Sequence, residues 1–187
     1  MKSEARKRGF GLIIVIVVTA FLLVVGLLVA MITNTGSTVA SNVRLQEQAF
    51  NAAEAGFNAA WTRVEESLIA AGWTNFDGHC LDTPAGIDDP GEPEYFRKLT
   101  DEEFLTTLTP ATNGVVFYKE TYAPAAGGGM DVRYSYTVFL VEDDGGGMTV
   151  DPSDALLICI GAVQTGDTFT TARIEVGLSM QNSGTNP

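Results

Sequence analysis

The 187-residue chain has almost no histidine or cysteine: His79 is its one histidine, and Cys80 and Cys159 are its two cysteines. A structural zinc site takes about four nitrogen or sulfur ligands at close spacing, which this sequence does not offer. A cysteine nucleophile with a histidine base is equally hard to build, because His79 and Cys80 are adjacent and adjacent side chains point to different sides. The sequence therefore predicts neither a zinc site nor an enzyme.

Basic residues are also scarce beyond the first few positions. The chain carries 11 Lys and Arg against 23 Asp and Glu, a net charge of −12. Four of the bases, Lys2, Arg6, Lys7 and Arg8, precede residue 10, so the rest of the chain is strongly acidic. An acidic surface repels phosphate backbones and has no basic stripe to release their counterions. Nucleic-acid binding is not expected.

Charge of either sign is missing from residues 10–32, which form an unbroken apolar run. About 20 such residues at 1.5 Å per residue cross the hydrocarbon core of a bilayer. Basic residues ahead of the run predict a cytoplasmic N-terminus and an exported body. A cleaved secretory signal is the competing interpretation, but its apolar region is typically about 7–15 residues long and ends in a better small-residue cleavage site.

Proline is absent from residues 10–71, so one long helix is expected there. Its second part has an apolar face with intervals of three and four residues. That face consists of Leu45, Ala49, Ala53, Phe57, Ala60, Trp61, Val64 and Leu68. Gly36, beside Asn34, Thr35 and Ser37, predicts a kink or a melted turn within the helix.

The remaining residues, 72–187, predict a separate α+β head. A loop rich in Gly, Pro and Asp at 75–93 precedes a short helix at 96–108, with Thr100 as its N-cap and Glu103 as the capping-box partner. Four β-rich runs at 115–122, 132–141, 155–163 and 169–180 predict an antiparallel meander, and the alternation at 133–139 predicts one buried face. The expected fold is a long N-terminal helix packed on a four-stranded antiparallel sheet.

Two further features of the head leave alternatives open. In an oxidising compartment Cys80 and Cys159 would form a disulfide; otherwise they are two buried thiols. The acidic loops at 88–92, 142–144 and 151–154 offer oxygen ligands for calcium, but without the EF-hand spacing. Solvated turns are the favoured interpretation of these loops, and no cofactor is expected.

The order of basic leader, apolar helix, amphipathic helix, loop and sheet resembles type IV pilins and the pseudopilins of type II secretion. Lys7-Arg8-Gly9-Phe10 resembles the site at which a prepilin peptidase cuts after the glycine, and the new N-terminal Phe10 is then methylated. The resemblance implies a leader at 1–9, a transmembrane and assembly helix at 10–71 and an extracytoplasmic head at 72–187. The alternative is an uncleaved signal anchor.

A second motif lies at residues 48–56, which read QAFNAAEAG. It resembles the AxxAAEAG signature of PilX-like minor pilins. The matching positions are Ala49, Ala52, Ala53, Glu54, Ala55 and Gly56. Such small residues suit close packing against neighbouring helices. The alternative is a helix segment on the inner face of the head.

Ile14 is a departure from the pilin pattern. Most pilins have a glutamate at the fifth mature position, which is residue 14 here, and that carboxylate pairs with the terminal amine of a neighbouring subunit. A buried carboxylate left unpaired would cost several kcal/mol. Its replacement by isoleucine removes the need for such a partner and resembles minor subunits that initiate or prime a filament near its tip.

The resemblance as a whole implies a minor pilin or pseudopilin with a structural role. Its implied partners are the prepilin peptidase, a major pilin and other minor pilins. Its implied location is the bacterial inner membrane, with the N-terminus cytoplasmic, and then a filament in the periplasm or at the cell surface. The alternative is a bitopic, signal-anchored membrane protein whose acidic extracytoplasmic domain binds a partner.

Overall fold

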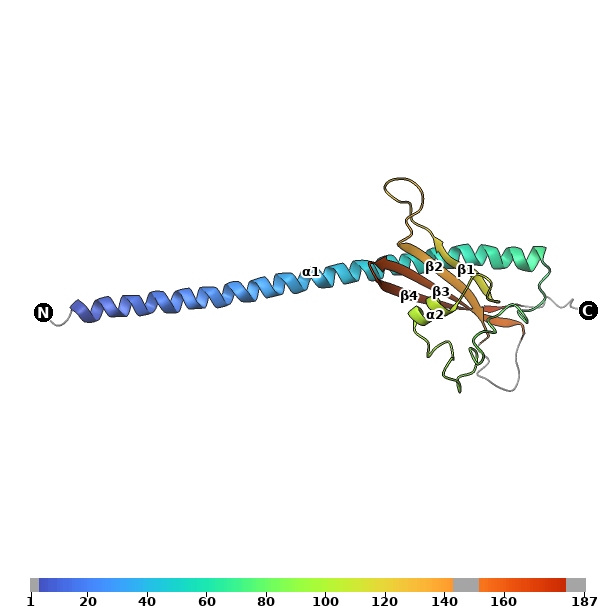
Figure 1. Cartoon of the computed structure of the whole chain (residues 1–187), viewed down its shortest axis with the longest axis horizontal. Coiled ribbons are helices and arrows are strands. Elements are labelled where there is room, and N and C mark those ends of the chain that lie inside the picture. Colours follow the sequence, from blue (N-terminus) through green and yellow to red (C-terminus); the bar gives the residue numbers. More distant parts are fainter. Residues whose placement is uncertain (1–3, 143–151, 181–187) are drawn as a thin grey trace, which may run out of the picture. The chain divides into compact units, whose positions relative to one another are not determined.

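A computed structural model describes residues 4–142 and 152–180 of the chain (Figure 1). The elements are α1 (Glu4–Ala70), α2 (Asp101–Thr107), β1 (Val115–Thr121), β2 (Tyr134–Val141), β3 (Asp154–Thr165) and β4 (Thr168–Ser179). The chain forms two compact units, Met1–Arg44 and Leu45–Pro187, and the boundary between them falls inside α1. The expected α+β class, with a long N-terminal helix and a four-stranded antiparallel sheet, is confirmed.

The first unit is the N-terminal part of α1, whose apolar side chains are exposed from Leu12 to Ile32. Within the described residues, α1 is the one helix long and apolar enough to cross a membrane. Two hydroxyl groups in or beside this apolar segment are satisfied inside the helix: Thr19 and Thr33 donate to carbonyl oxygens one turn back, at 2.9 Å. Such bonds remove polar groups that an apolar medium would otherwise leave unpaired.

The expected melted turn at Gly36 is wrong, because α1 stays helical through residues 33–38. The side chains there do not compete with the helix for its backbone groups. Thr35 donates to the carbonyl of Met31 at 2.9 Å, and Thr38 donates to that of Asn34 at 3.2 Å. A carbonyl oxygen has two lone pairs, and the helical hydrogen bond uses one of them. These hydroxyls donate to the other.

The second unit contains the sheet, with strand order β1-β2-β3-β4 and antiparallel pairing throughout. The pairing of β2 with β3 and of β3 with β4 is regular. The pairing of β1 with β2 has two register shifts, one on each side of Phe117. Lys119 there has φ 49°, and its backbone amide donates to the hydroxyl of the fully buried Thr137 at 3.1 Å. The predicted meander is confirmed.

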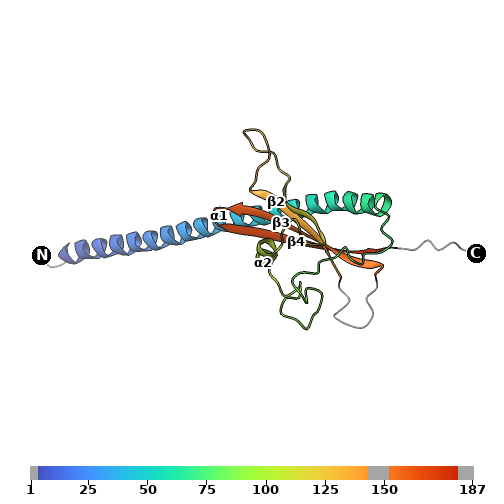
Figure 2. The same cartoon turned by 45° about the vertical axis from the view of Figure 1, so that its right-hand side comes forward.

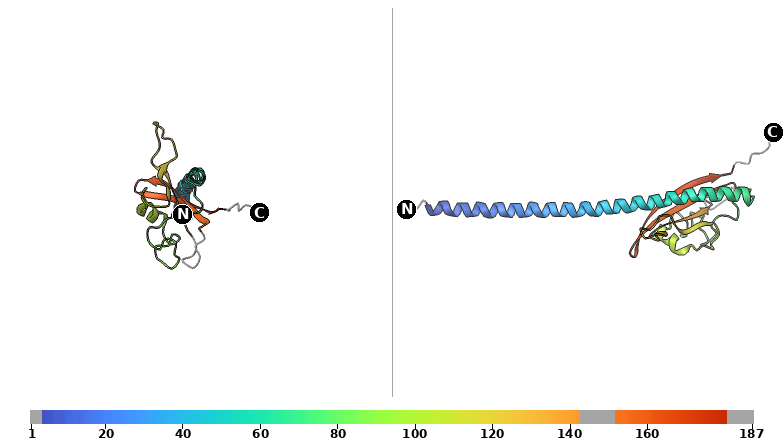
Figure 3. Two further views of the ribbon diagram at one scale, coloured as in Figure 1. Left: turned by 90° about the vertical axis from the view of Figure 1, so that its right-hand side faces the viewer. Right: turned by 90° about the horizontal axis from the view of Figure 1, so that it is seen from above.

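The central strands are buried on both faces, so the expectation of a single buried face is wrong for β2. Val138 and Leu140 lie in one apolar cluster with Ala60 and Val64 of α1. The alternate residues of β2 lie in a second cluster with Phe104 of α2 and the segment before it. Figure 2 and Figure 3 show α1 and α2 on opposite faces of the sheet. A strand covered on both faces is apolar at consecutive positions rather than alternate ones.

The helix α2 starts directly after the predicted cap, Thr100, so the expected start at residue 96 is wrong, and residues 96–98 form a turn. The amide of Glu103 donates to the hydroxyl oxygen of Thr100 at 3.3 Å, and the amide of Thr100 donates to the Glu103 carboxylate at 2.6 Å. The Thr100 hydroxyl also donates to this carboxylate, at 2.8 Å. The two bonds that the carboxylate accepts lower the pKa of Glu103, the bond from the Thr100 backbone being the larger cause. Because the pKa is lower in the folded state, this contribution to stability is present at neutral pH and is lost as the carboxylate protonates in acid.

Replacing Thr100 by alanine should lower the free energy of unfolding by about 1 kcal/mol, since it leaves the amide of Glu103 without its side-chain acceptor. Thr106→Ala is the matched control, because its hydroxyl only donates to carbonyl oxygens within α2. Urea unfolding followed by circular dichroism measures both. Equal stability of the two variants would contradict the capping role.

Candidate functional site

The leader junction lies in the first unit. The backbone of Gly9 and Phe10 is part of α1, while the side chain of Phe10 and residues 1–3 lie outside the description. Ile14 lies on α1 with 48% of its surface exposed, among other exposed apolar side chains. Cleavage after Gly9, methylation of Phe10 and a role for Ile14 in assembly stay predictions.

The small-residue motif lies in the second unit and packs on the sheet of the same chain. Ala49, Ala52 and Ala53 are fully buried. They face Gly161 of β3, where a Cβ atom would fall on the carbonyl oxygen of Ala49 and the amide nitrogen of Ala53. The backbones of helix and strand therefore approach too closely for any side chain at residue 161.

Gly56 extends the same contact one turn further along α1. A Cβ atom there would lie 2.9 Å from the ring of Tyr136 on β2. Ala55 is half-buried, and Glu54 is the exposed member of the motif. The buried members of the motif therefore serve the inner face of the head, and the interpretation that they pack against neighbouring helices is wrong for them, since their own sheet covers them.

The predicted inner face of α1 needs one more correction. Trp61 is 51% exposed, whereas its neighbour Ala60 is fully buried. Adjacent helical residues are about 100° apart, so both cannot face the sheet at close approach. The close contact of α1 with Gly161 was not predicted, although a glycine inside an otherwise apolar strand is a known sign of close backbone approach.

Cys80 and Cys159 lie in the same buried cluster, and both are thiols in this structure. Burial raises the pKa of Cys159 to about 12. Its thiol is therefore protonated at neutral pH and is a poor nucleophile. A disulfide between the two cysteines stays a prediction.

The acidic loop at 88–92 is held by donors of the chain itself. The amide of Gly91 donates to the Asp89 carboxylate at 2.7 Å, and Lys98 donates to the carbonyl oxygens of Pro90 and Glu92 at 2.6 and 2.8 Å. Among residues 4–142 and 152–180, no group of three or more His, Cys, Asp or Glu side chains is placed to hold a metal ion. Asp143, Asp144 and Asp151 of the other two acidic loops lie outside this description.

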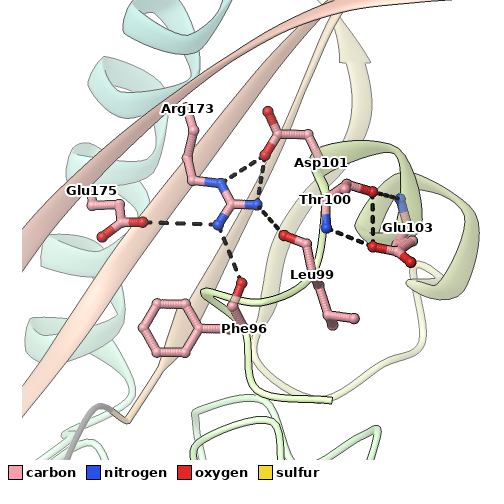
Figure 4. A network of polar contacts seen from close by, with 7 residues as sticks. All are labelled: Phe96, Leu99, Thr100, Asp101, Glu103, Arg173 and Glu175. Atoms are coloured by element: carbon pink, nitrogen blue, oxygen red, sulfur yellow. Dashed lines mark hydrogen bonds and ion pairs between the residues drawn. The ribbon is translucent and has the colours of Figure 1, made fainter. Parts of the chain in front are cut away.

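Arg173 of β4 joins the sheet to the start of α2 (Figure 4). Its guanidinium contacts the Asp101 carboxylate at 2.6 and 2.7 Å and donates to the carbonyl oxygens of Phe96 and Leu99 at 3.2 Å. It also lies over the ring of Phe104, 5.2 Å from the ring centroid. Arg173 and Asp101 are mostly buried, with 18% and 17% of their side chains exposed. This cluster fixes the segment that covers the second face of the sheet.

The geometry defines an α+β protein in which one helix provides both a possible membrane span and the packing face of a sheet domain. No family model, no curated protein and no solved structure matches the chain.

Proposed function

We propose that the chain is a filament subunit of the type IV pilin class, a minor pilin or pseudopilin that is held in the bacterial inner membrane before assembly. The observation that carries the proposal is the continuity of α1. A single helix, Glu4–Ala70, holds an exposed apolar segment at one end and, from Ala49 to Val64, the buried face that packs on the sheet.

The exposed apolar segment requires a cover. Large side chains from Leu12 to Ile32 have between 38% and 71% of their surface exposed. Each Å² of apolar surface moved out of water contributes about 25 cal/mol, so an uncovered segment of this length is strongly unfavourable in water. Lipid covers it in the anchored state, and the apolar helices of other subunits would cover it in a filament.

The finer parts of the proposal come from the resemblance. Gly9-Phe10 is the proposed cleavage and methylation site, and the prepilin peptidase, a major pilin and other minor pilins are the proposed partners. Ile14 supports a position near the filament tip, because a subunit without the carboxylate needs no partner for it. The proposed role is structural, with no catalysis and no cofactor.

The mature N-terminus tests the proposal. The full chain is expressed in a host with an active prepilin peptidase, extracted from the inner membrane, and its intact mass is measured. We expect a chain that starts at methylated Phe10. A Gly9→Val variant should keep the leader, because the scissile position no longer fits a glycine-specific peptidase.

The host's own prepilin serves as the control for peptidase activity. If that prepilin is processed while the chain keeps Met1, the pilin proposal is wrong. The signal-anchored protein with an acidic binding domain then becomes the better description.

A further inference from the structure

A hollow of about 530 Å³ lies in the second unit, between the last turns of α1 and the end of β4. Neither its shape nor its lining follows from the filament role. Its apolar walls are formed by Trp61, Leu68, Trp73, Phe76, Leu178 and Met180. A concave site of this size, mostly apolar and aromatic with a few polar groups, is typical of a binding site.

The walls of the hollow are held in place by contacts within the chain. Gly72, with φ 67°, turns the chain after α1, and the ring of Trp73 stacks on that of His79 with centroids 3.7 Å apart. The amide of Phe76 donates to the carbonyl of Pro152 at 2.7 Å. A site whose walls are fixed before binding loses little conformational entropy when it is filled.

One wall of the hollow is an outer strand of the sheet. β4 pairs only with β3 among the described strands, so one side of its backbone has no strand partner. Gly177 of β4 lines the hollow, and no atom lies within 4 Å of the place where its Cβ would be. An extended peptide can add to such an edge through main-chain hydrogen bonds and place alternate side chains in an adjoining hollow.

The charge of the residues that line the hollow indicates which charge a bound ligand would carry. Among the described lining residues, Glu65 is the one that carries a charge. The chain as a whole is also acidic, with a net charge of −12. A lysine or arginine side chain would contact the Glu65 carboxylate and the face of an indole ring, both of which favour a cation.

We propose that the hollow and the outer edge of β4 bind an extended apolar segment of a partner protein that carries a lysine or arginine. The proposed binding does not rest on leader cleavage or on filament assembly. The sheet-containing unit would bind this partner in a pilin and in a signal-anchored membrane protein alike.

Intrinsic fluorescence tests the proposal directly, because both tryptophans of the chain line the hollow. The full-length protein in detergent micelles is titrated with the acetylated and amidated peptide Thr-Val-Lys-Val-Thr. Two matched peptides have glutamate in place of lysine, or serine in place of both valines. We expect a saturable shift in tryptophan emission with the first peptide and none with the other two.

Glu65→Lys should weaken binding of the first peptide about tenfold, the ratio that corresponds to about 1.4 kcal/mol. Glu66→Lys is the matched control, since Glu66 lies one residue further along and pairs with Arg63 at 3.7 Å. Its affinity should stay within about twofold of the original protein. Circular dichroism melting curves check that both variants keep the fold.

Three results would overturn the proposal. The first is no saturable change with the lysine peptide, and the second is an equal response to all three peptides. The third is an equal loss of affinity in the Glu65 and Glu66 variants. An emission shift that follows detergent concentration alone would assign the hollow to a lipid chain instead.

Discussion

Replacing Gly161 by valine should lower the free energy of unfolding of the sheet-containing unit by about 3 kcal/mol, the upper end of the range for overpacked interiors. The new Cβ would fall on the carbonyl oxygen of Ala49 and the amide nitrogen of Ala53. Both are backbone atoms of a helix, so no side-chain rotation can make room. The helix must move away from the sheet, and the contacts of Ala52 and Gly56 are lost with it.

Gly177→Val on the neighbouring strand is the matched control, because no atom lies within 4 Å of its Cβ position. Its stability should stay within about 0.5 kcal/mol of the original chain. Urea unfolding of the full chain in detergent, followed by tryptophan fluorescence, reports on this unit since Trp61 and Trp73 both belong to it. Equal stability of the two valine variants would show that α1 is not seated on the sheet as described.

Replacing Arg173 by methionine should have the second largest effect, a loss of about 2–3 kcal/mol. The Asp101 carboxylate would lose its cation while it stays mostly buried. The carbonyl oxygens of Phe96 and Leu99 would lose their donor as well. Methionine keeps most of the contact area with Phe104, so the loss reports chiefly on the polar contacts.

Arg133→Met is the control for Arg173→Met. Arg133 also contacts an aspartate at 2.6 Å, but that residue, Asp131, is two positions away in the sequence and the arginine side chain is 63% exposed. The Asp131 side chain is itself 14% exposed, so the two pairs differ mainly in the arginine. Because solvent reaches most of Arg133, its replacement should lower the free energy of unfolding much less than the replacement of Arg173 does. The same unfolding measurement compares the two variants. If both lose the same stability, the Arg173 cluster does not hold the segment before α2 on the sheet.

The local features of the fold could be predicted from the sequence. The four strands lie within a few residues of their predicted bounds, because alternation and turn residues act over short distances. The cap of α2 could be predicted from Thr100 and Glu103 alone. Each of these features is determined by residues that are close together in the sequence, so no contact between distant segments is needed to predict it.

The contacts between distant segments could not be predicted in the same way. Arg173 and Asp101 are 72 positions apart, and the sequence pattern around one of them does not indicate that it contacts the other. The covering of the second sheet face depends on where the irregular segment before α2 folds back, which periodicity does not encode. The same holds for the tryptophan-lined hollow, whose walls come from the end of α1, the loop after it and β4.

The predicted functional residues fall into two groups: those whose contacts lie within the chain, and those whose proposed contacts are with other molecules. The role of the small-residue motif became clear only from its contact with Gly161, since small residues suit a partner helix and a nearby sheet equally well. The roles proposed for Gly9, Phe10 and Ile14 concern processing and contacts with other subunits. These roles involve molecules other than this chain. The N-terminal mass measurement tests the roles of Gly9 and Phe10, and the role of Ile14 in assembly stays a prediction.

The continuity of α1 through Gly36 also has a mechanical consequence. A helix that belongs to both units transmits a pull on the sheet to the apolar segment through backbone hydrogen bonds that run along its axis and are loaded in series. From Ala49 to Val64 one face of the helix is buried on the sheet, whereas residues 33–44 are exposed on all sides and include Gly36. Under tension the helix should therefore lengthen first at residues 33–44, which lie between the apolar segment and the part of α1 that packs on the sheet.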